Sequence, residues 1–272
     1  MTDPAVHFDV EGAVATLTFA DEARMNPLTP AFFAGAFEAI ERVHADASIR
    51  VLVLAARGKG FCVGADLADL QRRTETGDGG GVSVAIGELM DESGNPLVLA
   101  LRALPVPVLA VVQGAVAGGG VGIARAAAGV GAARSAYFML PFVPALGLVP
   151  DMGSSWFLQR AVGSPRALGM ALLGDRLSAE QAAAWGVIWR CVDDEALAAE
   201  ASRLAARLAA LPAHAALETR ALFRAAAENT LPGQLAYERD RQTALAGGPC
   251  LGEGVSAFLA RRRPVFAGRE PS

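Results

Sequence analysis

The 272-residue sequence has little of several residue types that would point to a particular class of protein. Its three cysteines, Cys62, Cys191 and Cys250, show no paired spacing. This odd number argues against a disulfide framework and fits a reducing cytoplasm. Lys59 is the only lysine and the net charge is −4, so no strong electrostatic attraction to nucleic acid or to an anionic membrane is expected. We therefore expect a cytoplasmic protein with neither of these partners.

Motifs for metal and nucleotide binding are also missing. None of the three histidines, His7, His44 and His214, neighbours a nucleophile or a second ligand-type residue at metal spacing. The sequence has no H-E-x-x-H, no C-x-x-C and no carboxylate cluster, so no metal centre is expected. A G-x-x-x-x-G-K-[ST] loop and a G-x-G-x-x-G turn are absent too, which argues against phosphate-loop and dinucleotide-binding proteins.

The sequence offers no clear targeting or membrane segment. The first twelve residues carry acids and no apolar core, which is unlike a signal peptide. The longest uncharged run, residues 103–124, is long enough to span a bilayer, but it contains Pro105, Pro107 and a cluster of glycines between Gly114 and Gly120. This composition predicts a strand followed by a glycine turn.

Hydrophobic residues make up 53% of the chain and charged residues 19%, which is typical of one large domain or a domain with an appendage. The periodicity predicts mixed helices and strands up to about residue 150, and helices almost exclusively from Gly153 onward. The first half is expected to hold a hairpin (5–10 and 13–19), a helix from Thr29-Pro30 to about Ala45, buried strands (51–55 and 108–112) and helices (84–104 and 120–128). Two short strands near 129–132 and 136–139 follow, and a last one is expected from Val187 to Cys191.

Two segments share a pattern that can do chemistry. The buried strands 51–55 and 108–112 each lead into a glycine-bearing loop, 58–64 or 114–120, and then into a helix. Such a turn leaves backbone N–H groups free at a helix N-terminus, where they can bind an anion or a developing oxyanion. Each loop alone is also compatible with an ordinary tight turn.

The residues in these loops match known sequence motifs. FCVGADL and QGAVAGGGVGIA resemble the two signatures of the crotonase (enoyl-CoA hydratase/isomerase) superfamily. The hairpin, the segment Asp21 to Thr29 and the stretch LGLVPDMGSSWFLQRAVG match as well, so the resemblance covers nearly the whole chain. The stretch from Ala171 to Asp194 and the tail EGVSAFLARRRPVFAG are most similar to the isomerases of bacterial phenylacetate degradation, which act on ring-1,2-epoxyphenylacetyl-CoA.

The resemblance implies an α/β fold with a core of stacked β-β-α turns, expected over residues 1–195 with the acyl-CoA site. It implies a C-terminal helical region, 196–272, that builds trimers, often paired into hexamers. The ligand would be an acyl-CoA thioester, and no cofactor is expected because CoA is part of the substrate. In the family two backbone N–H groups form an oxyanion hole, which correspond here to Ala65 and Gly119. The residues expected to contact the acyl-CoA are Ala23, Met25, Val63, Gly64, Ala65, Asp66, Leu67, Gly118, Gly119, Phe142 and Val143.

The resemblance also locates the acid/base. Hydratases of the family use two glutamates, whose positions correspond here to Gly122 and to Val143, with Phe142 as the alternative alignment. None of these residues is a carboxylate. The isomerases carry a single acid/base at the position of Asp151, which we expect to be catalytic with a pKa raised by burial. Asp151 could equally cap the helix that begins near Gly153, and the two roles are compatible.

Other charged residues near the loops have weaker assignments. Asp66 is expected mainly to organise its loop and start the next helix. Arg57 and Lys59 could approach CoA phosphates, and Arg220, Arg261 and Arg262 match basic positions near the CoA 3′-phosphate or a neighbouring subunit in relatives. The expected function is isomerisation of an acyl-CoA, either a double-bond shift or the opening of a ring epoxide. The alternatives are an enoyl-CoA hydratase with an atypical acid/base set and a non-catalytic acyl-CoA binder; an RNA-binding relative is disfavoured by the charge.

Overall fold

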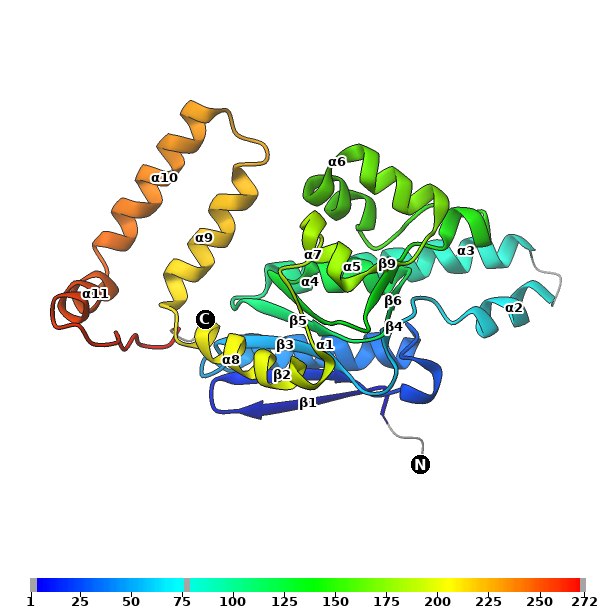
Figure 1. The fold of residues 1–272 in the computed structure, drawn as a ribbon, viewed down its shortest axis with the longest axis horizontal. Coiled ribbons are helices and arrows are strands. Elements are labelled where there is room, and N and C mark those ends of the chain that lie inside the picture. Colours follow the sequence, from blue (N-terminus) through cyan, green and yellow to red (C-terminus); the bar gives the residue numbers. More distant parts are fainter. Residues whose placement is uncertain (1–3, 76–78, 270–272) are drawn as a thin grey trace.

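The computed structural model describes residues 4–75 and 79–269, which form two stacked sheets with helices around them (Figure 1). The first sheet has the order β1-β2-β3-β5-β7-β10, and all its pairs except the β1–β2 hairpin are parallel. Its strands are β1 (Val6–Glu11), β2 (Val14–Phe19), β3 (Val51–Ala56), β5 (Val108–Val112), β7 (Gly129–Ala133) and β10 (Arg190–Val192). The second sheet, ordered β4-β6-β8-β9, consists of β4 (Gly60–Cys62), β6 (Ala115–Ala117), β8 (Tyr137–Met139) and the antiparallel β9 (Leu177–Ser178).

The helices follow the strands along the chain. They are α1 (Pro30–Ala45), α2 (Leu67–Glu75), α3 (Gly79–Leu89), α4 (Asn95–Ala103), α5 (Gly119–Ala126), α6 (Ser154–Leu173), α7 (Ala179–Trp185), α8 (Leu197–Ala209), α9 (Ala213–Ala225), α10 (Leu231–Ala246) and α11 (Pro249–Leu259). Short 3-10 turns, η1 (Glu22–Arg24) and η4 (Asp194–Ala196), and π-helical turns, η2 (Met90–Gly94) and η3 (Phe142–Leu146), join them.

Local sequence explains the first elements as predicted. The hairpin turns at Gly12, whose φ of +58° suits glycine, and pairs Glu11 with Val14. Thr29 caps α1 because its Oγ1 accepts a hydrogen bond from the Phe32 amide at 3.2 Å, and Pro30 fills the first helical position.

The central strand β3 is buried on both faces, as its continuous apolar run predicts. Leu52 and Leu54 point into the main core, which α1, α4 and α5 help to fill. Val51 and Val53 belong to a second apolar cluster on the opposite face, where α8 packs with Ala205 at its centre. A strand whose two faces both meet helices needs hydrophobic residues at every position.

Some expected boundaries were wrong. Each glycine loop contains a short strand, β4 or β6. After its strand in the first sheet ends, the chain pairs again in the second sheet, where β4 and β6 are neighbours. The helix expected at 84–104 is interrupted, since α3 begins at Gly79 and the π-turn η2 separates it from α4. Residues 76–78, next to this start, lie outside the described residues. The last strand, β10, begins three residues and ends one residue later than expected, and β9 was missed.

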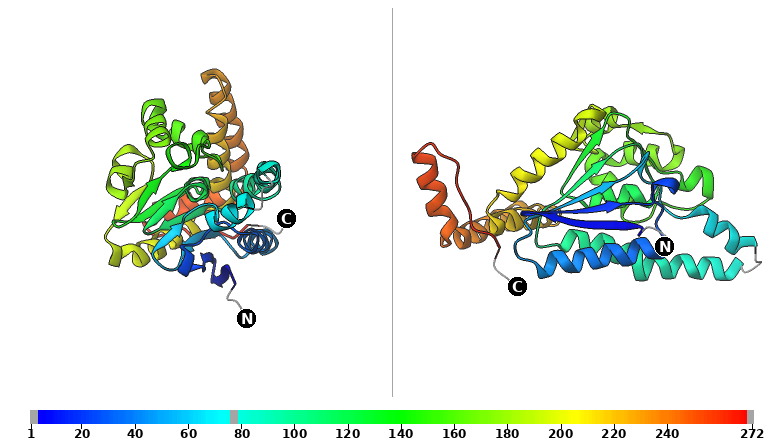
Figure 2. Two further views of the ribbon diagram at one scale, coloured as in Figure 1. Left: turned by 90° about the vertical axis from the view of Figure 1, so that its right-hand side faces the viewer. Right: turned by 90° about the horizontal axis from the view of Figure 1, so that it is seen from below.

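The run 103–124 forms the strand, turn and helix start that its glycines predict, and no helix in the described part of the chain is long and apolar enough to cross a membrane. Helices α9 to α11 project from one side of the two-sheet core, as Figure 1 and the right view of Figure 2 show. Arg220 of α9 ties this projection to the end of α4 by donating to the carbonyls of Arg102, Leu104 and Val106 at 2.7–2.9 Å. The division of the chain at residue 195 stays a prediction.

Candidate active site

The two glycine loops lie side by side because the strands that precede them are neighbours. Strands β4 and β6 pair in parallel, so the turns after them emerge at the same edge of the second sheet. The backbones then come into contact: a Cβ placed on Gly64 would lie 3.1 Å from the Gly119 nitrogen and 3.2 Å from the Ala117 oxygen. Gly64 also has φ +83°, which glycine adopts without strain. The structure thus brings together the loop residues expected from the sequence.

Two backbone amides at this contact are unpaired. Ala65 follows Gly64, and Gly119 is the first residue of α5. Within residues 4–75 and 79–269, neither of these two amides donates a hydrogen bond to the protein. The Gly119 amide also lies at the positive end of the helix dipole of α5. Two free amides on touching turns are the elements from which an oxyanion hole is built.

Asp151 lies close to Gly119, which carries the second of these amides. Its buried Oδ1 lies 3.5 Å from where a Cβ on Gly119 would be, and among the residues that the structure describes this oxygen has no hydrogen-bond partner. Burial raises the pKa of Asp151 to about 6, because the low-dielectric surroundings disfavour the charged carboxylate. A partly buried carboxyl with a raised pKa and an unused oxygen can take up and release a proton near neutral pH.

The expected helix-capping role of Asp151 is wrong for its side chain. The residue at the N-cap of α6 is Gly153, and no side chain caps this helix. Only the backbone carbonyl of Asp151 contributes, by accepting a hydrogen bond from the Ser154 amide at 2.9 Å. The carboxyl is therefore not engaged in holding the helix, and its direction is set by the turn that follows.

That turn is strained and tightly packed. Met152 has φ +50°, an unfavourable conformation for a residue with a side chain, and Gly153 continues in the same region. Met152 is buried against α5, where a Cβ on Gly122 would lie 2.2 Å from the Met152 carbonyl oxygen. Gly122 is the position of the first hydratase glutamate, so a side chain there would need the turn beside Asp151 to move.

The second hydratase position is also occupied by an apolar residue. Phe142 and Val143 begin the π-helical turn η3. Phe142 is buried, and its ring Cζ would lie 3.7 Å from a Cβ on Gly118. Of the two alternative alignments, Phe142 is thus the residue seen to approach the second glycine loop.

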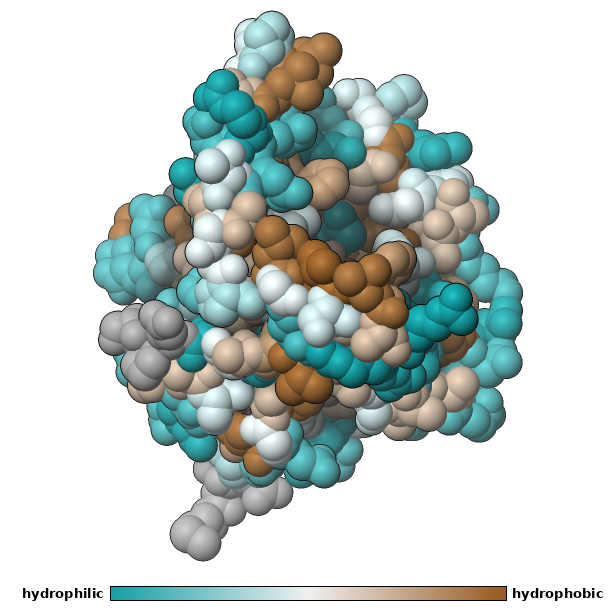
Figure 3. All heavy atoms as spheres, turned by 90° about the vertical axis from the view of Figure 1, so that its left-hand side faces the viewer, coloured by the Kyte–Doolittle hydropathy of each residue, from teal (hydrophilic) through white to brown (hydrophobic). Residues whose placement is uncertain are grey.

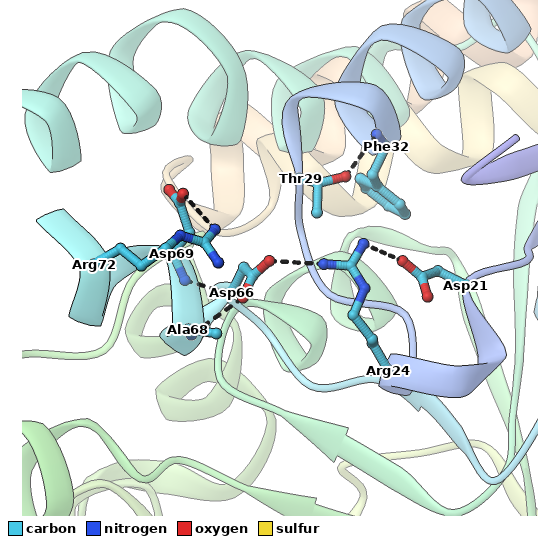
Figure 4. A network of polar contacts seen from close by, with 8 residues as sticks. All are labelled: Asp21, Arg24, Thr29, Phe32, Asp66, Ala68, Asp69 and Arg72. Carbon is cyan, nitrogen blue, oxygen red and sulfur yellow. Dashed lines mark hydrogen bonds and ion pairs between the residues drawn. The ribbon is translucent and has the colours of Figure 1, made fainter. Parts of the chain in front are cut away.

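The first loop carries Asp66 in the organising role expected of it. Asp66 Oδ1 accepts hydrogen bonds from the amides of Ala68 at 3.1 Å and Asp69 at 3.3 Å, which starts α2 (Figure 4). Its Oδ2 accepts from Arg24 at 2.8 Å. Val63 and Gly64 precede it in the loop.

The segment Asp21–Leu28 runs along the first loop and contains two residues that the motifs did not single out. Arg24 pairs with both Asp21 and Asp66, and the buried Asn26 donates to loop carbonyls. The only signal for them was that this segment matched the superfamily. The expected contact residues Ala23, Met25 and Leu67 are exposed beside the loop.

Other candidates have different surroundings. Burial raises the pKa of the Cys62 thiol to about 12, which fits a packed residue and not a nucleophile. Arg220 donates its guanidinium hydrogens to carbonyls at and just beyond the end of α4, and Arg262 pairs with Glu253 at 2.6 Å. Among the described residues, no group of histidine, cysteine and acidic side chains is arranged to hold a metal ion.

The chain is similar to known proteins over nearly its whole length. A family model for enoyl-CoA hydratase/isomerase matches residues 9–269. The chain belongs to this family. It is 43% identical over 260 residues to a 1,2-epoxyphenylacetyl-CoA isomerase of Escherichia coli strain K12, covering 96% of this chain and 97% of the relative. It is 38% identical over 269 residues to a protein of Rhodobacter capsulatus named as a probable enoyl-CoA hydratase, covering 99% and 100%.

The fold agrees with this membership. A crystal structure of an enoyl-CoA hydratase from Polaromonas sp. JS666 superposes with a TM-score of 0.87 at 30% identity, covering 96% of this chain and 99% of that one. The expected crotonase fold is thereby confirmed. The protein is a member of an enzyme family whose named relatives include isomerases and hydratases of acyl-CoA thioesters.

The raised pKa of Asp151 makes stability depend on pH in a defined direction. The folded chain binds the proton of the Asp151 carboxyl more tightly than the unfolded chain does. The contribution of this group to the free energy of unfolding therefore falls as the pH rises from about 4 through about 6. Asp151→Asn removes this pH dependence. We therefore expect the free energy of unfolding of the variant, relative to that of the wild type, to increase by up to about 3 kcal/mol from pH 4 to pH 8. Denaturant unfolding at both pH values and one protein concentration measures this gain.

Asp175→Asn is the control for that measurement, because it removes an exposed carboxylate without relieving burial. A stability difference between Asp151→Asn and wild type that stays constant with pH would contradict the raised pKa.

Proposed function

We propose that this protein is an acyl-CoA isomerase that works with a single carboxyl acid/base and needs no cofactor beyond the CoA of its substrate. The observation that carries the proposal is the buried Oδ1 of Asp151, which lies close to Gly119 and has no hydrogen-bond partner among the described residues. The carboxyl and the oxyanion donors of the family thus lie at one place in a chain that has no second carboxylate at either hydratase position.

The chemistry follows from these groups. Asp151 as carboxylate takes a proton from a carbon of the acyl group, and the electron pair of that C–H bond moves towards the thioester oxygen. The amides of Ala65 and Gly119 donate to the resulting (di)enolate oxygen; loss of one such donor typically costs about 3–4 kcal/mol of transition-state stabilisation. Asp151 then returns the proton at another carbon, so the double bond moves and no atom is gained or lost. A pKa near 6 suits both steps.

The substrate class within this proposal follows the relatives. The Escherichia coli relative is named for 1,2-epoxyphenylacetyl-CoA, so a role in phenylacetate catabolism is favoured over one in fatty acid metabolism. For a ring epoxide, the same amides would stabilise the enolate that assists epoxide opening. We further propose that the enzyme works in the cytoplasm.

The alternative of a hydratase is supported by the names of several relatives, but the site argues against it. Gly122 has no room for a glutamate because the Met152 carbonyl fills that space. A non-catalytic acyl-CoA binder would keep the two amides but would gain nothing from burying an unpaired carboxyl, which lowers stability.

Asp151→Asn tests the proposed base. The amide keeps the shape of the side chain but cannot shuttle a proton, so we expect a folded protein that still binds acyl-CoA and has lost isomerase activity by at least about 10²-fold. Activity is measured on a 3-enoyl-CoA by the rise of conjugated-enoyl absorbance, with mass spectrometry of the product, and Asp175→Asn serves as the matched control. Retained activity in the folded variant would remove Asp151 from the mechanism.

Water addition provides a second test. Nothing at Gly122 or Val143 can deprotonate a water molecule, so we expect crotonyl-CoA hydration to be slower than 3-enoyl-CoA isomerisation by about two orders of magnitude. Gly122→Glu should not restore hydration, because its side chain would collide with Met152 and the second carboxylate would still be missing. The readout is loss of enoyl absorbance with a product heavier by one water. Efficient hydration by the wild type would overturn the isomerase proposal in favour of the hydratase.

We also propose a homotrimer or a dimer of trimers, assembled through the C-terminal helices. The face that carries α9 to α11 shows a band of hydrophobic residues (Figure 3). The large apolar side chains left exposed on these helices and the tail include Phe223, Leu231, Phe258, Leu259 and Val265, each at least 71% exposed. Apolar surface of this extent is typical of a subunit interface.

Sedimentation tests the assembly. We expect the wild type to sediment as a trimer or hexamer at micromolar concentration and Phe258→Asp to shift it towards monomer, because a buried charge opposes association. Ser256→Asp puts the same charge on another face of α11 and is the control. A stable wild-type monomer would contradict the proposed interface.

A further inference from the structure

The segment Asp21–Leu28 holds the first glycine loop at several points. The Leu28 amide donates to the Gly64 carbonyl at 2.8 Å, and Leu28 forms a parallel bridge with Ala65. The Asn26 side-chain amide donates to the carbonyls of Arg57 at 3.1 Å and Gly60 at 2.9 Å. These bonds follow the loop from its beginning to the residue whose amide is free, so the position of that amide depends on the segment.

The backbone of the segment is strained where it makes these contacts. Met25 and Asn26 are consecutive non-glycine residues with φ of +57° and +58°. Such conformations are unfavourable and persist where the surrounding structure over-determines them, which occurs at functional sites more than elsewhere. Asn26 is 1% exposed, and the hydrogen bonds of its side chain hold the backbone in this conformation.

Arg24 completes the connection through charge. Its guanidinium lies between two carboxylates, Asp21 of its own segment and Asp66 of the loop (Figure 4). Asp66 immediately follows Ala65, and its other oxygen is already held by the first amides of α2. Arg24 therefore immobilises the second oxygen and fixes the residue next to the free amide from both sides.

We infer that Arg24 is a positioning residue of the acyl-CoA reaction, which holds the Ala65 amide in place through Asp66. The inference rests on the proposed function, because it assigns Arg24 to the oxyanion hole of that reaction. Arg24 itself need not touch the substrate. The planar fork of arginine can reach two carboxylates at once, which the single ammonium of lysine does less well.

A direct role of Arg24 in binding CoA phosphates is the competing explanation. Arg24 is 54% exposed, so a phosphate could reach it. However, two carboxylates already neutralise its charge, and together the three groups carry a net charge of −1, which would repel a phosphate. The arrangement thus favours a contact within the protein.

The ion pair should matter more for catalysis than for stability. Exposed ion pairs contribute little to folding, whereas a misplaced catalytic group can slow a reaction by a large factor. We expect Arg24→Gln to lower kcat by about tenfold or more, with KM and the thermal unfolding midpoint nearly unchanged. Arg24→Lys should recover part of the loss. Arg72→Gln, which breaks the 3.0 Å pair with Asp69 one turn along α2, is the matched control and should keep wild-type kcat.

Two further comparisons separate the explanations. An N-acetylcysteamine thioester of the same acyl group has no CoA phosphates, so a positioning role predicts the same fold loss in kcat with it as with the CoA thioester. If Arg24 bound CoA phosphate, the loss would appear as a raised KM and vanish with the short thioester. A double-mutant cycle compares Arg24→Gln, Asp66→Asn and the double variant. If Arg24 acts only through its contact with Asp66, the double variant should lose little more kcat than the worse single variant.

The outcomes are distinguishable from failure of the proposed function. Wild-type protein without isomerase activity on either thioester would overturn the proposed function and the inference with it. An active wild type whose Arg24→Gln variant keeps its kcat, or additive losses in the cycle, would overturn the inference alone. If Arg24→Gln does not fold, the same comparisons are made with Arg24→Lys and Asp66→Asn. Faster amide hydrogen exchange in residues 60–68 of the folded variant is the structural sign expected of a released loop.

Discussion

The close approach of the two glycine loops is the constraint on which the rest of the site depends. Gly64 meets the second loop so closely that a Cβ on it would lie 3.1 Å from the Gly119 nitrogen and 3.3 Å from the Gly118 Cα. This approach is possible only because β4 and β6 are neighbours in the second sheet and end at the same edge. The free amides of Ala65 and Gly119 are a consequence, since their turns leave them without a hydrogen-bond partner in the described part of the chain.

The same close packing determines where the carboxyl can lie. Helix α5 presents glycines at positions 119 and 122, and the Met152 turn fills the space that side chains would take. Asp151 is thereby held beside Gly119 in a water-poor setting, which raises the pKa of its carboxyl. Small residues on one helix thus decide both the position of the acid/base and its affinity for protons. The cost is the strained backbone at Met152.

The C-terminal helices differ from the rest of the chain in how little of their surface is buried. Helix α8 covers the outer face of the first sheet and buries Ala205 there. The following helices α9 to α11 have few buried side chains of their own, and in the described chain only Ala257 among their residues is buried. These helices therefore form without completing a core, which is why their apolar residues stay on the surface of the single chain.

The sequence by itself determined the elements whose signals are local. The alternation around Gly12, the Thr29-Pro30 helix start and the unbroken apolar run of β3 all predict the observed structure, because turn, cap and burial patterns act over a few residues. The residues of the glycine loops also identified the family and named Ala65 and Gly119 as candidates, and the matching stretch LGLVPDMGSS added Asp151. Only the tertiary structure decided the short strands β4, β6 and β9, because a strand of two or three residues is fixed by its neighbour in the sheet. Tertiary contacts likewise decided that Asp151 does not cap α6, that Met152 excludes a side chain at Gly122, and that Arg24 reaches Asp66, 42 residues away, since each contact joins segments distant along the chain.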